Sequence, residues 1–277
     1  MTWRPWPSPR RPWTLEVLLP GSVLSTEQDL RDKTYKAGFI SRALAIFRVD
    51  VVTIYSDDDT VEEDKSLLSL LLRYQVTPPH LKRRALPMRS ELRFAGLMPP
   101  LNLPNHRPPR EAVPGAVMDG LVTSAKGGSC EVYLGELGLG TLTPCEERPG
   151  SIVTVSINSS YGGELQLARA SWGDLYVGYR VREGGYLTVE LERLRSEGFA
   201  VVGTSRYGST NYAALSGLEG RPVAVVVGGP REGLLQYVNL KSFDVVLNTV
   251  PRQGTETVRS EEALLSTLAI VSAFLSG

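Results

Sequence analysis

Three stretches near the end of the chain decide its fold: AVVGTSRYG (Ala200 to Gly208), VAVVVGGPREG (Val223 to Gly233) and DVVLNTVPRQGTETVRSEEALL (Asp244 to Leu265). Each begins with an apolar run and continues into a segment rich in glycine or small polar residues. Apolar runs without polar alternation are typical of strands that are buried on both faces of a parallel sheet. Ligands of such sheets bind beyond the carboxyl ends of the strands, so the three segments predict one shared binding site.

The amino-terminal part of the chain predicts further strands of the same kind. An apolar run over residues 13–19 ends at Pro20-Gly21, and apolar residues at helical spacing follow over residues 30–48. A second run, VVTIY at residues 51–55, completes a strand, helix, strand unit, which predicts parallel pairing of the two strands. Further helices are expected over residues 65–74 and 260–275, the last with two glutamates in its first turn.

The middle of the chain has a different character. Residues 112–170 contain five short β-like runs, broken by glycine, proline or asparagine, and lack a helical period. This pattern indicates a small antiparallel barrel, for which an OB-like fold is one candidate. The predicted fold class is α/β, a mainly parallel sheet with an inserted OB-like β-barrel. The expected parts are a flexible tail (1–10), a first α/β part with a basic linker (11–110), the barrel (111–170) and a second α/β part (171–277).

Composition limits the class of protein. The 277 residues are 42% hydrophobic, which is enough for a large core. The two cysteines, Cys130 and Cys145, lack the CxxC spacing or histidine partners of a zinc site, so we expect no metal and a reducing, cytoplasmic setting. The chain contains neither an uninterrupted apolar stretch of membrane-spanning length nor a signal-peptide core, so no membrane partner is expected.

A local cluster of positive charge stands against a formal net charge of zero. Seven lysines and arginines lie between His80 and Arg110 with a single acid, Glu91. A solvated surface and a nucleic-acid contact explain such a run equally well. The candidate RNA-binding residues are Lys82, Arg83, Arg84, Arg89 and Arg93.

Familiar catalytic motifs do not fit. GTSRYG has one residue too many for a GxSxG nucleophile elbow, and there is no GxxxxGK[ST] phosphate loop, HExxH or GxGxxG opening a helix. ELGLGTLTP, near Gly138, is followed by prolines, so we interpret it as a hairpin turn. A site made of backbone groups and small side chains from three loops suits an adenosine-containing cofactor. Turning of the chain after each strand is the alternative explanation for the glycines.

Three segments resemble motifs of the SPOUT class of trefoil-knotted RNA methyltransferases. YKAGFISRALAIFRVDVV (Tyr35 to Val52) is similar to the first motif, VVVGGPREGLL (Val225 to Leu235) to the second and LNTVPRQGTETVRSEEALLSTLA (Leu247 to Ala269) to the third. Nearly the whole chain after Arg11 resembles the archaeal and eukaryotic branch that has a β-barrel inserted between its halves. PPHLKRRAL and LRFAGLMPPL add to that likeness.

The resemblance implies a fold, a cofactor and site residues. It implies a carboxyl-terminal knot, a homodimer, S-adenosylmethionine as cofactor and an RNA substrate. It implies catalytic roles for Arg42 and Arg259. In GTSRYG an arginine is expected directly before the second glycine, where Tyr207 stands, so Arg206 receives no role. The implied cofactor-binding residues are Thr204, Ser205, Gly228, Gly229, Pro230, Glu232, Gly233, Leu247, Asn248, Thr249, Val250, Gln253, Gly254, Thr255 and Thr257.

The expected function is S-adenosylmethionine-dependent methylation of a structured RNA such as rRNA or tRNA. Arg42 stays protonated and presents a fork of donors, so it suits a phosphate or a developing anion better than it suits a base. One alternative is a non-catalytic RNA-binding assembly protein with a vestigial cofactor pocket. Another is a small-molecule α/β enzyme with an accessory barrel. The sequence does not choose between ribose oxygen and base nitrogen as the methyl acceptor.

Overall fold

The computed structural model describes residues 6–161, 164–231, 233–234 and 238–275. The chain divides into two compact units. The barrel unit comprises Met1–Arg10, Thr77–Ser90 and Asn102–Val177, and the sheet unit comprises Arg11–Val76, Glu91–Leu101 and Gly178–Gly277. The basic segment, which we predicted to be a linker, is thus divided between the two units.

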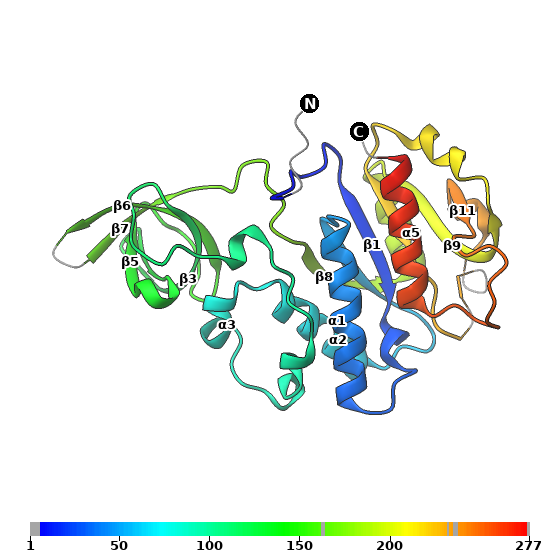
Figure 1. Ribbon diagram of the computed structural model, residues 1–277, viewed down its shortest axis with the longest axis horizontal. Coiled ribbons are helices and arrows are strands. Elements are labelled where there is room, and N and C mark those ends of the chain that lie inside the picture. Colours follow the sequence, from blue (N-terminus) through cyan, green and yellow to red (C-terminus); the bar gives the residue numbers. More distant parts are fainter. Residues whose placement is uncertain (1–5, 162–163, 232, 235–237, 276–277) are drawn as a thin grey trace. The chain divides into compact units, whose positions relative to one another are not determined.

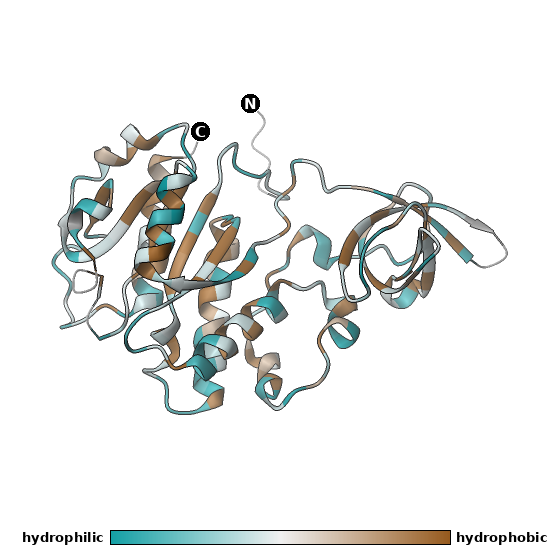
Figure 2. Ribbon diagram, turned by 180° about the vertical axis from the view of Figure 1, so that it is seen from behind, coloured by the Kyte–Doolittle hydropathy of each residue, from teal (hydrophilic) through white to brown (hydrophobic). Residues whose placement is uncertain are grey.

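Six parallel strands form the sheet of the sheet unit, in the order β11-β9-β10-β1-β2-β8 (Figure 1). All six residues of the central strand β1 are buried, including Glu16, which interrupts its otherwise apolar sequence; the strands of the sheet are mainly hydrophobic (Figure 2). The strands are β1 (Leu15–Pro20), β2 (Val51–Ser56), β8 (Arg180–Tyr186), β9 (Ala200–Ser209), β10 (Val223–Val226) and β11 (Val245–Leu247).

Helices cover both faces of this sheet. The two helices α1 and α5 lie side by side across one face (Figure 1), and α1 also packs against α2. The side chain of Asp29 caps α1 by accepting a hydrogen bond from the backbone N–H of Asp32. On the other face, α4 packs against β8, β9 and β2. The helices are α1 (Leu30–Ile46), α2 (Glu62–Val76), α4 (Leu187–Ser196) and α5 (Ser260–Phe274), with short 3-10 turns at η1 (Gly21–Leu24), η3 (Ala95–Leu97), η6 (Tyr212–Leu218) and η7 (Leu240–Ser242).

The barrel unit contains five strands that close in the order β3-β4-β5-β7-β6. Its core is apolar and includes Met118, Val132, Val155 and Ile157. Strands β4 and β5 pair antiparallel through the short turn η5 (Gly135–Leu137), which confirms the hairpin predicted for ELGLGTLTP. The elements are β3 (Val117–Lys126), β4 (Ser129–Tyr133), β5 (Leu139–Leu142), β6 (Ile152–Tyr161), β7 (Glu164–Arg169), the helix α3 (Pro79–Ala85) and the turn η4 (Pro104–His106), and η2 (Ser90–Leu92) lies at the boundary between the units.

The predicted fold class, a mainly parallel sheet with an inserted β-barrel, is confirmed, although β5 and β7 of the predicted antiparallel barrel pair in parallel. The knot stays a prediction. Within the described part of the chain, no helix is long and apolar enough to cross a membrane, and no group of three or more His, Cys, Asp or Glu residues could hold a metal ion.

Two features of the barrel unit differ from simple expectation. The backbone N–H of Arg10 donates to the carbonyl oxygen of Asp174, and that of Tyr176 donates to Ser8, so this part of the expected flexible tail is paired. Extended, proline-rich backbone has unpaired groups that can pair in this way. The sulfur atoms of Cys130 and Cys145 form a disulfide inside the barrel core, which differs from the reducing setting expected for these cysteines; their spacing of 15 residues does not signal the pairing.

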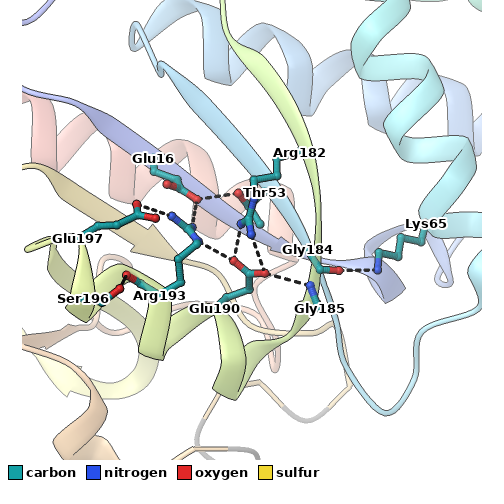
Figure 3. Close-up of polar contacts among 10 residues, drawn as sticks. All are labelled: Glu16, Thr53, Lys65, Arg182, Gly184, Gly185, Glu190, Arg193, Ser196 and Glu197. Carbon is teal, nitrogen blue, oxygen red and sulfur yellow. Dashed lines mark hydrogen bonds and ion pairs between the residues drawn. The ribbon is translucent and has the colours of Figure 1, made fainter.

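A polar network fixes α4 to the sheet (Figure 3). The Glu16 carboxylate of β1 accepts from Thr53 Oγ1 at 2.6 Å and from Arg193 at 2.5 Å. Glu190, 2% exposed, accepts from Arg193 Nε at 2.9 Å and from both terminal nitrogens of Arg182. Burial alone would raise the pKa of Glu190, but the hydrogen bonds from these arginines lower it below its ordinary value of 4.5. The network therefore contributes stability while Glu190 is ionised.

We predict that Glu190→Ala lowers the free energy of unfolding by about 3 kcal/mol, because it leaves Arg182 without its buried partner and Arg193 with Glu16 as its one buried carboxylate partner among the described residues. Glu197→Ala is the matched control, since Glu197 pairs with the same Arg193 but is 49% exposed; it should cost less than about 1 kcal/mol. Urea denaturation at neutral pH measures both. The stabilisation from Glu190 is present above its unfolded pKa and is lost as pH falls through its lower folded pKa, so Glu190→Gln should approach the wild type in acid. Equal losses for Glu190→Ala and Glu197→Ala would contradict the assignment.

Candidate functional site

The segments that follow β9, β10 and β11 converge on one cavity of about 220 Å³, which we call the loop cavity. This convergence follows from the parallel sheet, in which β9 pairs with both β10 and β11, so their carboxyl ends lie at one edge. The predicted cofactor residues that line the loop cavity are Thr204, Ser205, Gly228, Gly229, Pro230, Gly233, Leu247, Asn248, Thr249, Val250, Gln253 and Thr257.

Other predicted cofactor residues are placed differently. Gly254 and Thr255 lie in the third segment but are absent from the cavity lining among the residues that the structure describes. Glu232 lies outside the described residues. Sequence reasoning did not assign the remaining lining residues, which are Arg206, Tyr207, Val227, Arg231, Leu234, Glu256, Val258, Ser260 and Ala263.

The glycine loop after β10 folds tightly on itself. Gly233 has a φ of 70°, and its N–H donates to the carbonyl oxygen of Gly229 at 3.2 Å. A Cβ at Gly228 would lie 2.8 Å from the backbone of Gly233, closer than real Cβ contacts allow. Ser260 Oγ at the start of α5 donates to the carbonyl oxygen of Gly228 at 3.0 Å. The loop therefore requires glycine at both positions and is attached to the last helix.

Asn248 braces the first and third segments against each other. Its backbone N–H donates to the carbonyl oxygen of Ser209 at 2.9 Å, and its Nδ2 donates to that of Arg206 at 2.8 Å. Its Oδ1 accepts from the N–H of Val250 at 3.1 Å. Gln253 is also engaged locally, since its Nε2 donates to two carbonyl oxygens of its own loop. These side chains shape the loop cavity as well as line it.

A buried carboxylate lies against the glycine loop. Asp57, just beyond β2, accepts from Ser22 Oγ at 2.5 Å and from Thr60 Oγ1. Its Oδ2 is so close to Gly229 that a Cβ there would lie 2.7 Å away. Nearby, Asp59 pairs with Arg231 at 3.5 Å. Sequence reasoning noted the acidic run but did not connect it with the site; its position at the carboxyl end of a parallel strand was the available signal.

The lining of the loop cavity suits a nucleoside. Apolar side chains of Val227, Leu234, Leu247 and Val250 can contact a flat heteroaromatic ring, while hydroxyls, amides and loop backbone groups can bind its polar atoms. Glycines let the backbone approach the ligand closely. The cavity has the form expected for an adenosine-containing ligand.

Arg42 is not part of the loop cavity lining within the described residues of one chain. It lies in α1, and its guanidinium donates to the carbonyl oxygens of Pro100 at 3.0 Å and Leu101 at 3.3 Å. The 91–101 segment is also held by Gln75 Nε2, which donates to Pro99 at 2.6 Å. Arg42 therefore has a structural contact in addition to the catalytic role predicted for it.

Arg259 stands at the N-terminus of α5. Its backbone N–H donates to Glu262 at 2.9 Å in a capping box, and its exposed guanidinium pairs with Glu27 at 3.4 Å. Its neighbours in sequence, Val258 and Ser260, line the loop cavity, whereas its own side chain borders a second surface pocket with Tyr35 and Lys36.

The candidate RNA-binding residues fall in both units. Lys82, Arg83 and Arg84 occupy the last turn of α3 in the barrel unit, where Arg84 lies 3.9 Å from the ring centre of Tyr133. Burial lowers the pKa of Lys82 to about 8, so its charge declines in mildly alkaline solution. Arg89 is exposed in the barrel unit, and Arg93 is exposed in the sheet unit with its guanidinium 5.2 Å from the ring centre of Phe94.

The structure combines a parallel sheet, a glycine-rich cavity at the carboxyl ends of its strands and an inserted β-barrel. A model of the family described as "Putative RNA methyltransferase" matches residues 14–271. The chain belongs to this family and is an RNA methyltransferase, as the sequence motifs predicted.

The chain is similar to proteins known from sequence and to a solved structure. The human 28S rRNA (uridine-N(3))-methyltransferase is 32% identical over 94% of this chain and 78% of its own length. An uncharacterized protein of Halobacterium salinarum is 31% identical over 92% of this chain and 97% of its own length. The AdoMet-bound rRNA methyltransferase of Sinorhizobium meliloti has a TM-score of 0.42 and 10% identity, with 96% of this chain and 58% of that structure covered.

We predict that Gly228→Ala abolishes ligand binding in the loop cavity, because the new methyl group collides with the backbone of Gly233. Isothermal titration with S-adenosylmethionine measures the loss of affinity, and we expect Kd to rise by more than tenfold. Gly217→Ala is the control, since a Cβ there meets nothing within 4 Å. Unchanged affinity in Gly228→Ala would remove this cavity from consideration as the cofactor site.

Proposed function

We propose that this protein transfers the methyl group of S-adenosylmethionine to N3 of a uridine in large-subunit rRNA. The observation that carries the proposal is the loop cavity, which joins three segments similar to SPOUT cofactor motifs in one nucleoside-sized site. The human relative, named for 28S rRNA (uridine-N(3)) methylation, supports the substrate. When bound, the cofactor supplies an electrophilic methyl group.

The proposed reaction exchanges a proton on N3 of uridine for a methyl group. The N3–CH₃ bond forms as the S–CH₃ bond breaks, the sulfonium becomes a neutral thioether, and the N3 proton passes to water. The protein must hold the acceptor nitrogen in line with the methyl group and stabilise negative charge that develops on the uracil ring. Arginine is suited to the second task, because it stays protonated and has only donors.

The test combines cofactor binding with transfer. We expect one S-adenosylmethionine per chain by calorimetry. We also expect tritium from labelled cofactor to enter large-subunit rRNA transcribed in vitro from the source genome, with 3-methyluridine as the product by mass spectrometry. A different methylated nucleoside would reject uridine N3. If the protein binds rRNA but neither binds S-adenosylmethionine nor methylates the RNA, the assembly-protein alternative is favoured.

A homodimer is part of the proposal. One face of α1 presents Tyr35, Phe39 and Ile46 to solvent at spacings of four and seven residues, and Arg42 falls on the same face between them. Such an apolar stripe on an otherwise folded helix favours a covering partner. We propose that a second copy covers it, since the class resemblance implies a homodimer, and we further propose that Arg42 serves the site of the partner subunit.

We predict that Arg42→Ala abolishes methyl transfer while the Kd for S-adenosylmethionine stays within about twofold. Gln75→Ala is the matched control, since it releases the same 91–101 segment without removing the guanidinium. If Gln75→Ala loses as much methyl transfer as Arg42→Ala does, the role of Arg42 is structural rather than catalytic.

Mixing variants tests whether the arginine acts across subunits. Arg42→Ala and Gly228→Ala chains, unfolded and refolded together, should recover about a quarter of wild-type activity, because half the dimers are mixed and each has one intact site. No recovery would show that Arg42 serves its own chain or that the chains form no mixed dimers; co-purification of the untagged chain with an affinity-tagged partner chain distinguishes the two.

The basic residues and the barrel are the candidate RNA contacts. We propose that Lys82, Arg83, Arg84, Arg89 and Arg93 contact RNA phosphates, with binding that weakens as salt concentration rises. The strand order of the barrel favours an OB-like fold, a fold that often binds oligonucleotides. We also propose the trefoil knot and a cytoplasmic location. Protection of these residues from limited proteolysis by bound RNA would test the contacts. RNA binding that does not change with salt concentration would contradict them.

A further inference from the structure

A tyrosine at the rim of the loop cavity is left exposed where nothing in the core requires it. Tyr207 lines the cavity near the end of β9, yet 76% of the residue is accessible to solvent. The Arg206 guanidinium carbon lies 4.9 Å from the centre of the Tyr207 ring, a cation–π arrangement. A large aromatic ring in this position has surface available for another planar group.

The backbone on both sides of Tyr207 is fixed, so the ring does not belong to a loose loop. A Cβ at the following residue, Gly208, would lie 2.5 Å from the carbonyl carbon of Leu247, so the end of β9 crosses close to β11. Asn248 Nδ2 holds the carbonyl oxygen of Arg206, and the N–H of Tyr207 donates to Ser205 Oγ at 3.2 Å. The backbone that carries the ring and the guanidinium is therefore fixed beside the loop cavity.

Their chemistry matches a uracil base. An exposed aromatic face stacks on any nucleobase, and an adjacent arginine adds planar contact and charge. Uracil has carbonyl oxygens on both sides of N3, and arginine offers donors alone. When N3 loses its proton, the negative charge spreads to those two oxygens, where a nearby guanidinium stabilises it.

We propose that Tyr207 and Arg206 form the binding surface for the acceptor base, with Tyr207 stacked on the uracil and Arg206 donating to a carbonyl oxygen beside N3. This assignment rests on the proposed function. It gives Arg206 a role in the reaction, which the class resemblance did not assign to it. It also makes Tyr207 a substrate-binding residue rather than part of the cofactor site.

The experiment compares Tyr207→Ala, Tyr207→Phe and Arg206→Ala with wild type. Tyr186→Ala is the matched control, because Tyr186 is 64% exposed in β8 at the opposite edge of the sheet. The measurements are kcat/KM for methylation of in vitro transcribed large-subunit rRNA and Kd for S-adenosylmethionine. We expect Tyr207→Ala to lower kcat/KM roughly 5- to 100-fold, mainly through KM, as loss of one base stack does. Tyr207→Phe and Tyr186→Ala should stay within about twofold of wild type.

Arg206→Ala should lower kcat by tenfold or more, since it removes charge stabilisation in the transition state, and Arg206→Lys should recover part of that loss. All variants should keep the wild-type Kd for S-adenosylmethionine. Equal kcat/KM for Tyr207→Ala and wild type would overturn the proposal. A change in sedimentation of Tyr207→Ala would also overturn it, by assigning the ring to a protein interface.

A second measurement separates this inference from the proposed function. A 12-nucleotide oligouridylate is titrated into each protein saturated with S-adenosylhomocysteine. If wild type methylates no RNA, the proposed function fails, yet weaker oligouridylate binding by Tyr207→Ala and full binding by Tyr207→Phe still support the base-binding surface. Equal binding by Tyr207→Ala and wild type, or no binding by wild type, rejects it.

Discussion

Parallel pairing between β1 and β10 is the contact on which the sheet unit depends. Residues 15–18 pair with residues 223–226, so a strand near the start of the chain lies between β2 and a strand that begins 208 residues later. On its other side β10 pairs in parallel with β9, and β9 pairs with β11, so the ends of the three strands lie together. The loop cavity exists because these three carboxyl ends share one edge. Its glycines then allow the chain to turn within the small space that the strands leave.

The site combines close backbone packing with a few rigid polar braces. Gly208 and Gly228 lie where a side chain would strike another backbone segment, while Asn248 bridges the first and third segments. Asp57 supports the glycine loop from the neighbouring strand end. Such a site has little freedom to rearrange, which favours recognition of one ligand shape. In the proposed reaction, the acceptor base contacts Arg206 and Tyr207, which lie at the rim of this cavity.

The sequence predicts much of this architecture for physical reasons. Unbroken apolar runs such as Val223 to Val227 correspond to strands buried on both faces, and the change to short alternating runs after Ala112 marks the barrel. Helix α1 begins at Leu30, as its periodicity predicts, because Asp29 caps it. Contacts between residues far apart in sequence are not visible in this way. Neither the brace by Asn248, nor the support by Asp57, nor the disulfide follows from local pattern, since each depends on which segments tertiary packing brings together.

The order of the strands also bears on how the protein emerges from the ribosome. Synthesis proceeds from the amino terminus, so β1 and β2 leave the exit tunnel long before β10 is made. The barrel unit, whose strands all lie within residues 117–169, has its sequence complete while the sheet unit still lacks its central partner. Pairing at such long sequence separation makes folding slow and leaves an apolar strand exposed in the meantime. A nascent chain of this topology therefore has a prolonged interval in which a chaperone can bind β1, and truncation after the barrel would release an aggregation-prone fragment.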